Sequence, residues 1–127
     1  NLSMAANFIG GHPMAGSEKT GYAYSSDHLI ENAYYILTPT AKTDTTVLHA
    51  FRDYIASLGS VPMIMDAKTH DHATASISHL PHIIAATLVN YVKDSDTKSE
   101  LMKRLAAGGF KDITRIASSS PTMWQLL

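Results

Sequence analysis

The chain contains no cysteine among its 127 residues, and this absence excludes several kinds of chemistry. Disulfide bonds, zinc sites built from thiolates and thiol nucleophiles all require cysteine. A chain without cysteine fits a reducing compartment, and we expect a cytoplasmic protein. Long apolar runs are missing as well. The longest, residues 83–89, is far shorter than the roughly 18 residues that a membrane-spanning helix needs.

A surplus of charge of one sign is also lacking, since the formal net charge is -1. Without a basic surface we expect neither nucleic acid nor an anionic membrane as a partner. The dinucleotide-binding fingerprint G-x-G-x-x-G does not occur. Gly11 and Gly16 have the spacing of a phosphate-binding loop, but Ser17 and Glu18 occupy the positions where that loop needs Lys and then Ser or Thr. A carboxylate there would repel phosphate, so this loop is excluded.

The first half of the chain has the pattern of an α/β sheet. Two short runs rich in branched and aromatic residues, 34–38 and 61–65, predict strands. Between them, Thr43 or Asp44 can cap a helix with one apolar stripe, and Gly59 can end it. Strand, helix and strand with short connections indicate a βαβ unit, and therefore part of an α/β sheet.

From Asp66 onward the pattern becomes helical. Apolar residues recur at spacings of three and four between residues 73 and 91, which predicts one helix of about 25 residues with a kink at Pro81. Its broad apolar arc needs partners from missing sequence or from a second subunit. The pair Thr97 and Glu100 resembles a capping box for a further helix, which Gly108 and Gly109 would end.

His12 lies in the stretch where we expect chemistry. The apolar residues before it predict a buried strand that stops at Gly10 and Gly11. Ligands of α/β sheets bind beyond the carboxyl ends of strands, so His12 would lie at the mouth of a site. The glycine pair would let another molecule approach the backbone, and Pro13 would hold His12 on extended backbone. The alternative is that His12 merely follows a strand and the glycines shape a turn.

Two further groups are candidates for ligand binding. His79 and His82 flank Pro81, and His72 projects on nearly the same helical face as His79. No carboxylate stands at a ligand spacing, so we expect no metal site. These imidazoles either cap carbonyls that the proline frees or donate hydrogen bonds to a ligand. Arg115 is either paired with Asp112 or available to an anionic ligand. His28, His49 and His70 are assigned no role.

Three ordered blocks together resemble prephenate dehydrogenase, the NAD-dependent enzyme of tyrosine biosynthesis. They are GGHPMAGSEKTG at 10–21, SHLPH at 78–82 and AGGFKDITRIAS at 107–118. The resemblance implies late strands of a Rossmann-like dinucleotide-binding domain over residues 1–66. Residues 67–127 would form the first part of an all-α domain that binds substrate and makes a homodimer. The active site would lie between the two domains.

The resemblance also implies a set of site residues. His12 matches the catalytic histidine, and Pro13 and Met14 are expected to contact the cofactor. The substrate-binding positions would be Ser17, Glu18, His79, His82, Arg115 and Trp124, with Arg115 holding a carboxylate and Trp124 lying near the pocket or supplied by the neighbouring subunit.

The implied reaction is the oxidative decarboxylation of prephenate to 4-hydroxyphenylpyruvate, with NAD as hydride acceptor. A neutral imidazole near pKa 6.5 is suited to take the proton of the ring hydroxyl. The chain opens without an initiator methionine and lacks the strands that cradle the pyrophosphate, so we expect a fragment that neither binds NAD well nor turns over alone. The alternatives are arogenate dehydrogenase, a non-catalytic fragment that dimerises and binds prephenate or tyrosine as a feedback ligand, and a metal-dependent hydrolase.

Overall fold

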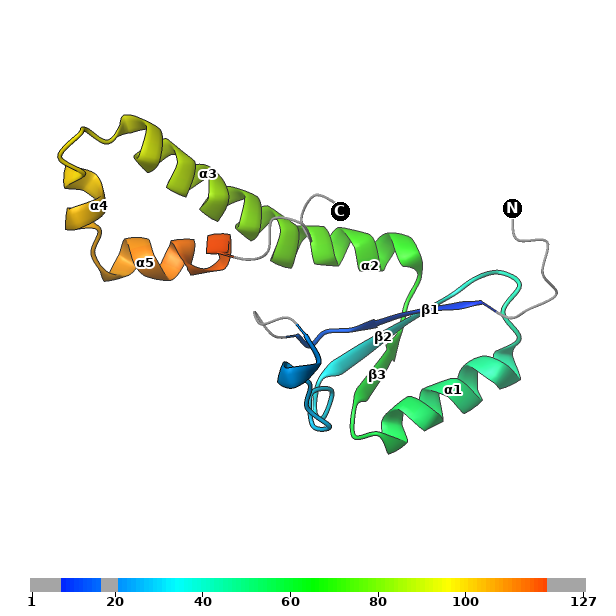
Figure 1. The fold of residues 1–127 in the computed structure, drawn as a ribbon. Coiled ribbons are helices and arrows are strands. Elements are labelled where there is room, and N and C mark those ends of the chain that lie inside the picture. Colours follow the sequence, from blue (N-terminus) through cyan, green and yellow to red (C-terminus); the bar gives the residue numbers. More distant parts are fainter. Residues whose placement is uncertain (1–7, 17–20, 119–127) are drawn as a thin grey trace. The chain divides into compact units, whose positions relative to one another are not determined.

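The structure, a computed structural model, describes residues 8–16 and 21–118 (Figure 1). It divides into two compact units, residues 1–72 and 73–127, which we describe separately. The first unit holds three strands and the helix between two of them. They are β1 (Ile9–Pro13), β2 (Tyr34–Pro39), α1 (Thr45–Ser57) and β3 (Val61–Ile64).

The three strands form one sheet in the order β1-β2-β3. β2 and β3 are parallel and joined through α1, which confirms the predicted βαβ unit. β1 pairs with β2 in the antiparallel direction, and its register places His12 opposite Ile36, which in turn lies opposite Met63. Consecutive residues of a strand point to opposite faces. Because Ile36 and Leu37 are both buried, both faces of the central strand are covered.

The ends of α1 follow from local sequence. The Asp44 carboxylate accepts hydrogen bonds from the backbone N–H groups of Thr46 and Val47 at 2.8 and 3.0 Å, as expected of an N-cap. At the other end Gly59 adopts φ 84°, a left-handed conformation that glycine reaches without steric cost. Leu48 and Ile55 form the buried stripe between these ends. The helix therefore begins and ends where the sequence predicts.

β1 differs from the prediction, because the strand continues through the glycine pair and includes His12. The space beside each glycine is filled by β2 and is not open to another molecule. A Cβ at Gly10 would overlap the Thr38 hydroxyl, and a Cβ at Gly11 would lie 3.0 Å from the Tyr35 ring. The glycines thus allow the two strands to pair closely.

The long helix predicted for the second half is divided into three parts. They are α2 (Ala67–Thr74), a π-helical turn (Ala75–His79) and α3 (Leu80–Ser95). Pro81 is the second residue of α3, and it supplies no N–H to a carbonyl one turn earlier. The wider π turn directly before it is the distortion that accompanies this proline, in place of a simple kink.

The next two helices are α4 (Leu101–Leu105) and α5 (Gly108–Thr114), and the ends predicted for the first of them were wrong. Thr97 and Glu100 form no capping box. The Asp96 carboxylate instead accepts hydrogen bonds from the backbone N–H groups of Met102 and Lys103, both at 3.0 Å. Gly108 begins α5 and does not end α4.

α3 is the central element of the second unit. It contacts α4, α5 and the 3₁₀ turn Arg115–Ser118, so the chain returns along α3 after the turn at α4 (Figure 1). Ala85 of α3 is fully buried, and its small side chain allows close approach of these elements. Among the helices of the described residues, none is long and apolar enough to cross a membrane.

Candidate functional site

His12 forms a pair with a second imidazole, His70 of α2. The Nδ1 atom of His12 lies 2.8 Å from Nε2 of His70, within hydrogen-bond distance. The two rings meet edge to face, with centroids 5.1 Å apart and planes at 75°. Both side chains are partly buried. The first unit therefore holds the predicted catalytic residue in a defined orientation, from a partner 58 residues away in sequence.

The start of α2 positions His70. Asp66 follows β3 and caps the helix: its carboxylate accepts the backbone N–H of Thr69 at 2.9 Å and the Thr69 hydroxyl at 2.5 Å. These hydrogen bonds, led by the one from the Thr69 side chain, lower the pKa of Asp66 below its ordinary 3.8. The backbone N–H of His70 donates to the Asp66 carbonyl at 3.1 Å, which closes the first turn. The cap thus sets where His70 stands relative to the sheet.

Asp71 extends the pair to three groups. Its Oδ1 atom lies 2.9 Å from Nδ1 of His70, so His70 bridges His12 and the carboxylate with its two ring nitrogens. The His70 side chain is 19% exposed, whereas that of Asp71 is 78% exposed. The chain of contacts therefore runs from a partly buried imidazole on the sheet to a carboxylate in water.

Sequence reasoning missed His70 and Asp71. The sequence around His70 does not reveal its contact with His12, because that contact forms only when α2 returns the chain to β1. The one available signal was the adjacency of His70 and Asp71, which places a carboxylate beside an imidazole.

The second unit holds three of the predicted substrate-binding residues. His79 ends the π turn, His82 is buried near the start of α3, and Arg115 begins the 3₁₀ turn that packs against α3. Arg115 is exposed. Two of these residues, His82 and Arg115, thus lie on elements that contact one another.

The structure describes only two of the remaining predicted site residues, Pro13 and Met14. Pro13 ends β1, and the exposed Met14 follows it, with its N–H bonded to the Tyr34 carbonyl at 2.8 Å. Ser17, Glu18 and Trp124 lie outside the described residues. Within residues 8–16 and 21–118, no three metal-ligating side chains gather closely enough to hold an ion.

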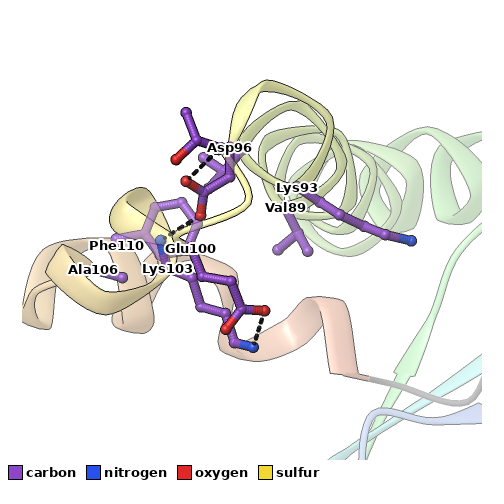
Figure 2. Close-up of a pocket in the computed structure, with 9 residues that line it drawn as sticks. Val89, Lys93, Asp96, Glu100, Lys103, Ala106 and Phe110 are labelled. Carbon is purple, nitrogen blue, oxygen red and sulfur yellow. Dashed lines mark hydrogen bonds and ion pairs between the residues drawn. The ribbon is translucent and has the colours of Figure 1, made fainter.

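The second unit also contains a pocket of about 500 Å³, shown in Figure 2. It lies where α3, α4 and α5 meet, and Glu100 and Lys103 form an ion pair of 2.8 Å at its edge. Val89, Val92 and Phe110 supply much of its apolar lining. The predicted site residues described by the structure do not line it, so we do not assign it to the site.

Two family models match consecutive parts of the chain. The nucleotide-binding domain of prephenate dehydrogenase matches residues 1–64, and the dimerization domain of prephenate dehydrogenase matches residues 66–127. The chain belongs to the prephenate dehydrogenase family. His12 falls in the part matched by the first model of this family, and His70 falls in the part matched by the second.

Individual relatives agree with this assignment. Prephenate dehydrogenase of Bacillus subtilis is 50% identical over 93% of the chain, which spans 32% of that relative. The crystal structure of the Aquifex aeolicus prephenate dehydrogenase with hydroxyphenyl propionate and NAD+ has a TM-score of 0.84 at 44% identity, covering 93% of this chain and 41% of that one. Synechocystis arogenate dehydrogenase has a TM-score of 0.83 at 34% identity, covering 96% of this chain and 45% of that one. The chain thus spans about a third of the length of its curated relative.

Proposed function

We propose that the protein containing this chain is an NAD-dependent prephenate dehydrogenase, which converts prephenate to 4-hydroxyphenylpyruvate and CO2. The observation that carries the proposal is the imidazole of His12, partly buried near the carboxyl end of β1 and held by His70. The family assignment and the 50% identity to the Bacillus subtilis enzyme support the same reaction.

His12 is the proposed general base. As the ring carbon of prephenate loses hydride, its hydroxyl oxygen develops carbonyl character and the hydroxyl proton becomes acidic. A neutral imidazole at this position takes that proton, and ring decarboxylation then restores aromaticity. The cofactor, when bound, supplies the hydride acceptor. Holding the substrate in the reactive geometry supplies much of the rate acceleration.

Arg115 is the proposed carboxylate anchor, and His79 and His82 are proposed to line the substrate pocket with Ser17, Glu18 and Trp124. A guanidinium presents paired N–H donors that match a carboxylate, which supports this role for Arg115. The imidazoles donate hydrogen bonds without adding a fixed charge.

The helix N-termini of the first unit do not fit the pyrophosphate of NAD. A pyrophosphate binds at a helix N-terminus that presents unoccupied N–H groups. Both strand-to-helix connections of the first unit instead carry an aspartate, Asp44 or Asp66, that caps the helix and places negative charge there. We therefore propose that only Pro13 and Met14, at the end of β1, contact the cofactor, at its nicotinamide end.

The proposed domain division follows from the same family. Residues 1–66 would be the C-terminal part of the nucleotide-binding domain, and residues 67–127 the first part of a helical domain that forms a homodimer. Exposed apolar side chains on α3, among them Ile83, Ile84 and Tyr91, support a subunit interface. Tyrosine is the proposed feedback ligand.

Replacement of His12 with Asn in the full-length enzyme tests the function. We expect kcat to fall by about 10²- to 10⁴-fold, the usual contribution of a general base, with KM changed little. His49, an exposed histidine of α1, provides the matched control His49→Asn, which should retain activity. Turnover at the wild-type level in His12→Asn would refute the assignment.

Arogenate is the second candidate substrate, because the likeness to Synechocystis arogenate dehydrogenase is nearly as strong. The two substrates differ only in the side chain, which carries a keto group in prephenate and an ammonium group in arogenate. Comparison of kcat/KM for the two separates them, and we expect prephenate to be preferred.

A further inference from the structure

We propose that Asp71 and His70 select the tautomer of His12 and are positioning residues for the base. The geometry that carries this inference is the continuous path from the Asp71 carboxylate, through both ring nitrogens of His70, to Nδ1 of His12. Its catalytic consequence rests on the proposed function, whereas the tautomer itself does not.

The direction of each hydrogen bond follows from the carboxylate. An ionised carboxylate can only accept, so Nδ1 of His70 carries a proton and donates it to Asp71. In a neutral imidazole the other nitrogen then lacks a proton, so Nε2 of His70 accepts. Nδ1 of His12, 2.8 Å away, must therefore carry the proton that is donated to His70.

This assignment determines which nitrogen of His12 is the base. With Nδ1 protonated, the lone pair of neutral His12 resides on Nε2. If His70 were turned or replaced, His12 would also populate the tautomer with Nε2 protonated, and that form cannot accept a proton there. A carboxylate that is 78% exposed can thus control a partly buried base two groups away.

Nitrogen-15 NMR of the full-length enzyme labelled at histidine, at a pH where both imidazoles are neutral, measures the tautomer directly. We expect the Nδ1–H form of His12 to predominate in the wild type. His70→Leu should lower its population, whereas His70→Gln should retain it because the amide can donate an N–H to the Asp71 carboxylate and accept from His12 through its oxygen. A wild-type His12 protonated at Nε2, or a His70→Leu variant with an unchanged tautomer, would overturn the proposal.

Asp71→Asn provides a second variant at an exposed position that should not affect folding. An asparagine amide can donate or accept, so the bias on His70 is lost and the Nδ1–H population of His12 should decrease. Asp53→Asn, at an exposed carboxylate of α1, is the control and should leave the tautomer unchanged. An Asp71→Asn spectrum identical to the wild type would contradict the role of the carboxylate.

Kinetics of the full-length enzyme measure the consequence. We expect His70→Leu to lower kcat by about 10- to 100-fold with KM within about twofold, and His70→Gln to recover most of the loss. An inactive His12→Asn beside a fully active His70→Leu would refute this inference but leave the proposed function standing. A fully active His12→Asn would remove the proposed function, whereas the NMR result on the tautomer would remain.

Discussion

Replacement of Gly10 with Ala tests how closely β1 and β2 pair beside His12. The new Cβ would overlap the Thr38 hydroxyl, while it would lie 3.6 Å from the Thr38 Cβ and 3.5 Å from its carbonyl oxygen, which are ordinary contacts. The whole conflict therefore comes from the outer atoms of one side chain. Overpacking of this kind costs about 1–3 kcal/mol, and the stiff χ1 of a β-branched residue limits relief by rotation.

The residue at position 38 should decide whether Gly10→Ala lowers or raises the free energy of unfolding. In the Thr38→Ala background the obstructing atoms are gone, and Gly10→Ala should then raise the free energy of unfolding by about 0.5–1 kcal/mol, because alanine loses less backbone entropy than glycine. Thr38→Val keeps the branched shape without the hydroxyl, so Gly10→Ala should remain destabilising in that background. The expected coupling between positions 10 and 38 is thus about 1.5–4 kcal/mol.

Urea unfolding of the single and double variants measures this coupling. With m near 1–3 kcal/mol/M, a loss of about 2 kcal/mol moves the midpoint by roughly 1 M, which is well resolved. Gly16→Ala is the control, because a Cβ there meets nothing within 4 Å. An equal cost of Gly10→Ala in the wild-type and Thr38→Ala backgrounds would show that the overlap does not limit stability.

Two other changes test features of each unit. Gly59→Ala should lower the free energy of unfolding by about 1–2 kcal/mol, because φ 84° is strained for alanine and its Cβ would lie 3.1 Å from Glu31 Cγ. Urea unfolding measures this loss. The control Gly109→Ala, where a Cβ in α5 meets nothing within 4 Å, should not lower the free energy of unfolding. Hydrogen bonds from Lys103 and Met102 lower the pKa of Asp96 below 3.8, so its stabilising effect is complete above that value and is lost as the pH falls through the lowered pKa. The urea midpoint of Asp96→Asn should therefore lie below that of the wild type near pH 6 and approach it near pH 3. A difference that grows on acidification would contradict this sign.

Features set by neighbouring residues could be predicted from the sequence. The N-cap at Asp44 and the glycine that ends α1 depend on contacts within a few residues, and they were confirmed. The βαβ unit was also confirmed, because the order strand, helix, strand with short connections favours parallel pairing of the two strands. The helical second half was also predicted, since the period of its apolar residues reports one face of a helix.

Features set by distant residues could not be predicted. Gly10 and Gly11 suggest a turn in isolation, but side chains of β2 occupy the space beside them and the strand continues. The capping box failed because the carboxylate of Asp96, one residue earlier than Thr97, reaches N–H groups six and seven residues ahead. Of the candidate site, His12 was proposed from its own surroundings in the chain and stays a prediction, whereas its contact with His70 depends on the tertiary fold.

The contact between His12 and His70 has a consequence for recombination within the family. The two family models meet at residue 65, yet the first compact unit extends to residue 72 and includes His70. A chimaera joined at the model boundary would take the two imidazoles from different parents, and the first domain expressed alone to residue 64 would lose one of them. A crossover placed after residue 72 would inherit the pair intact.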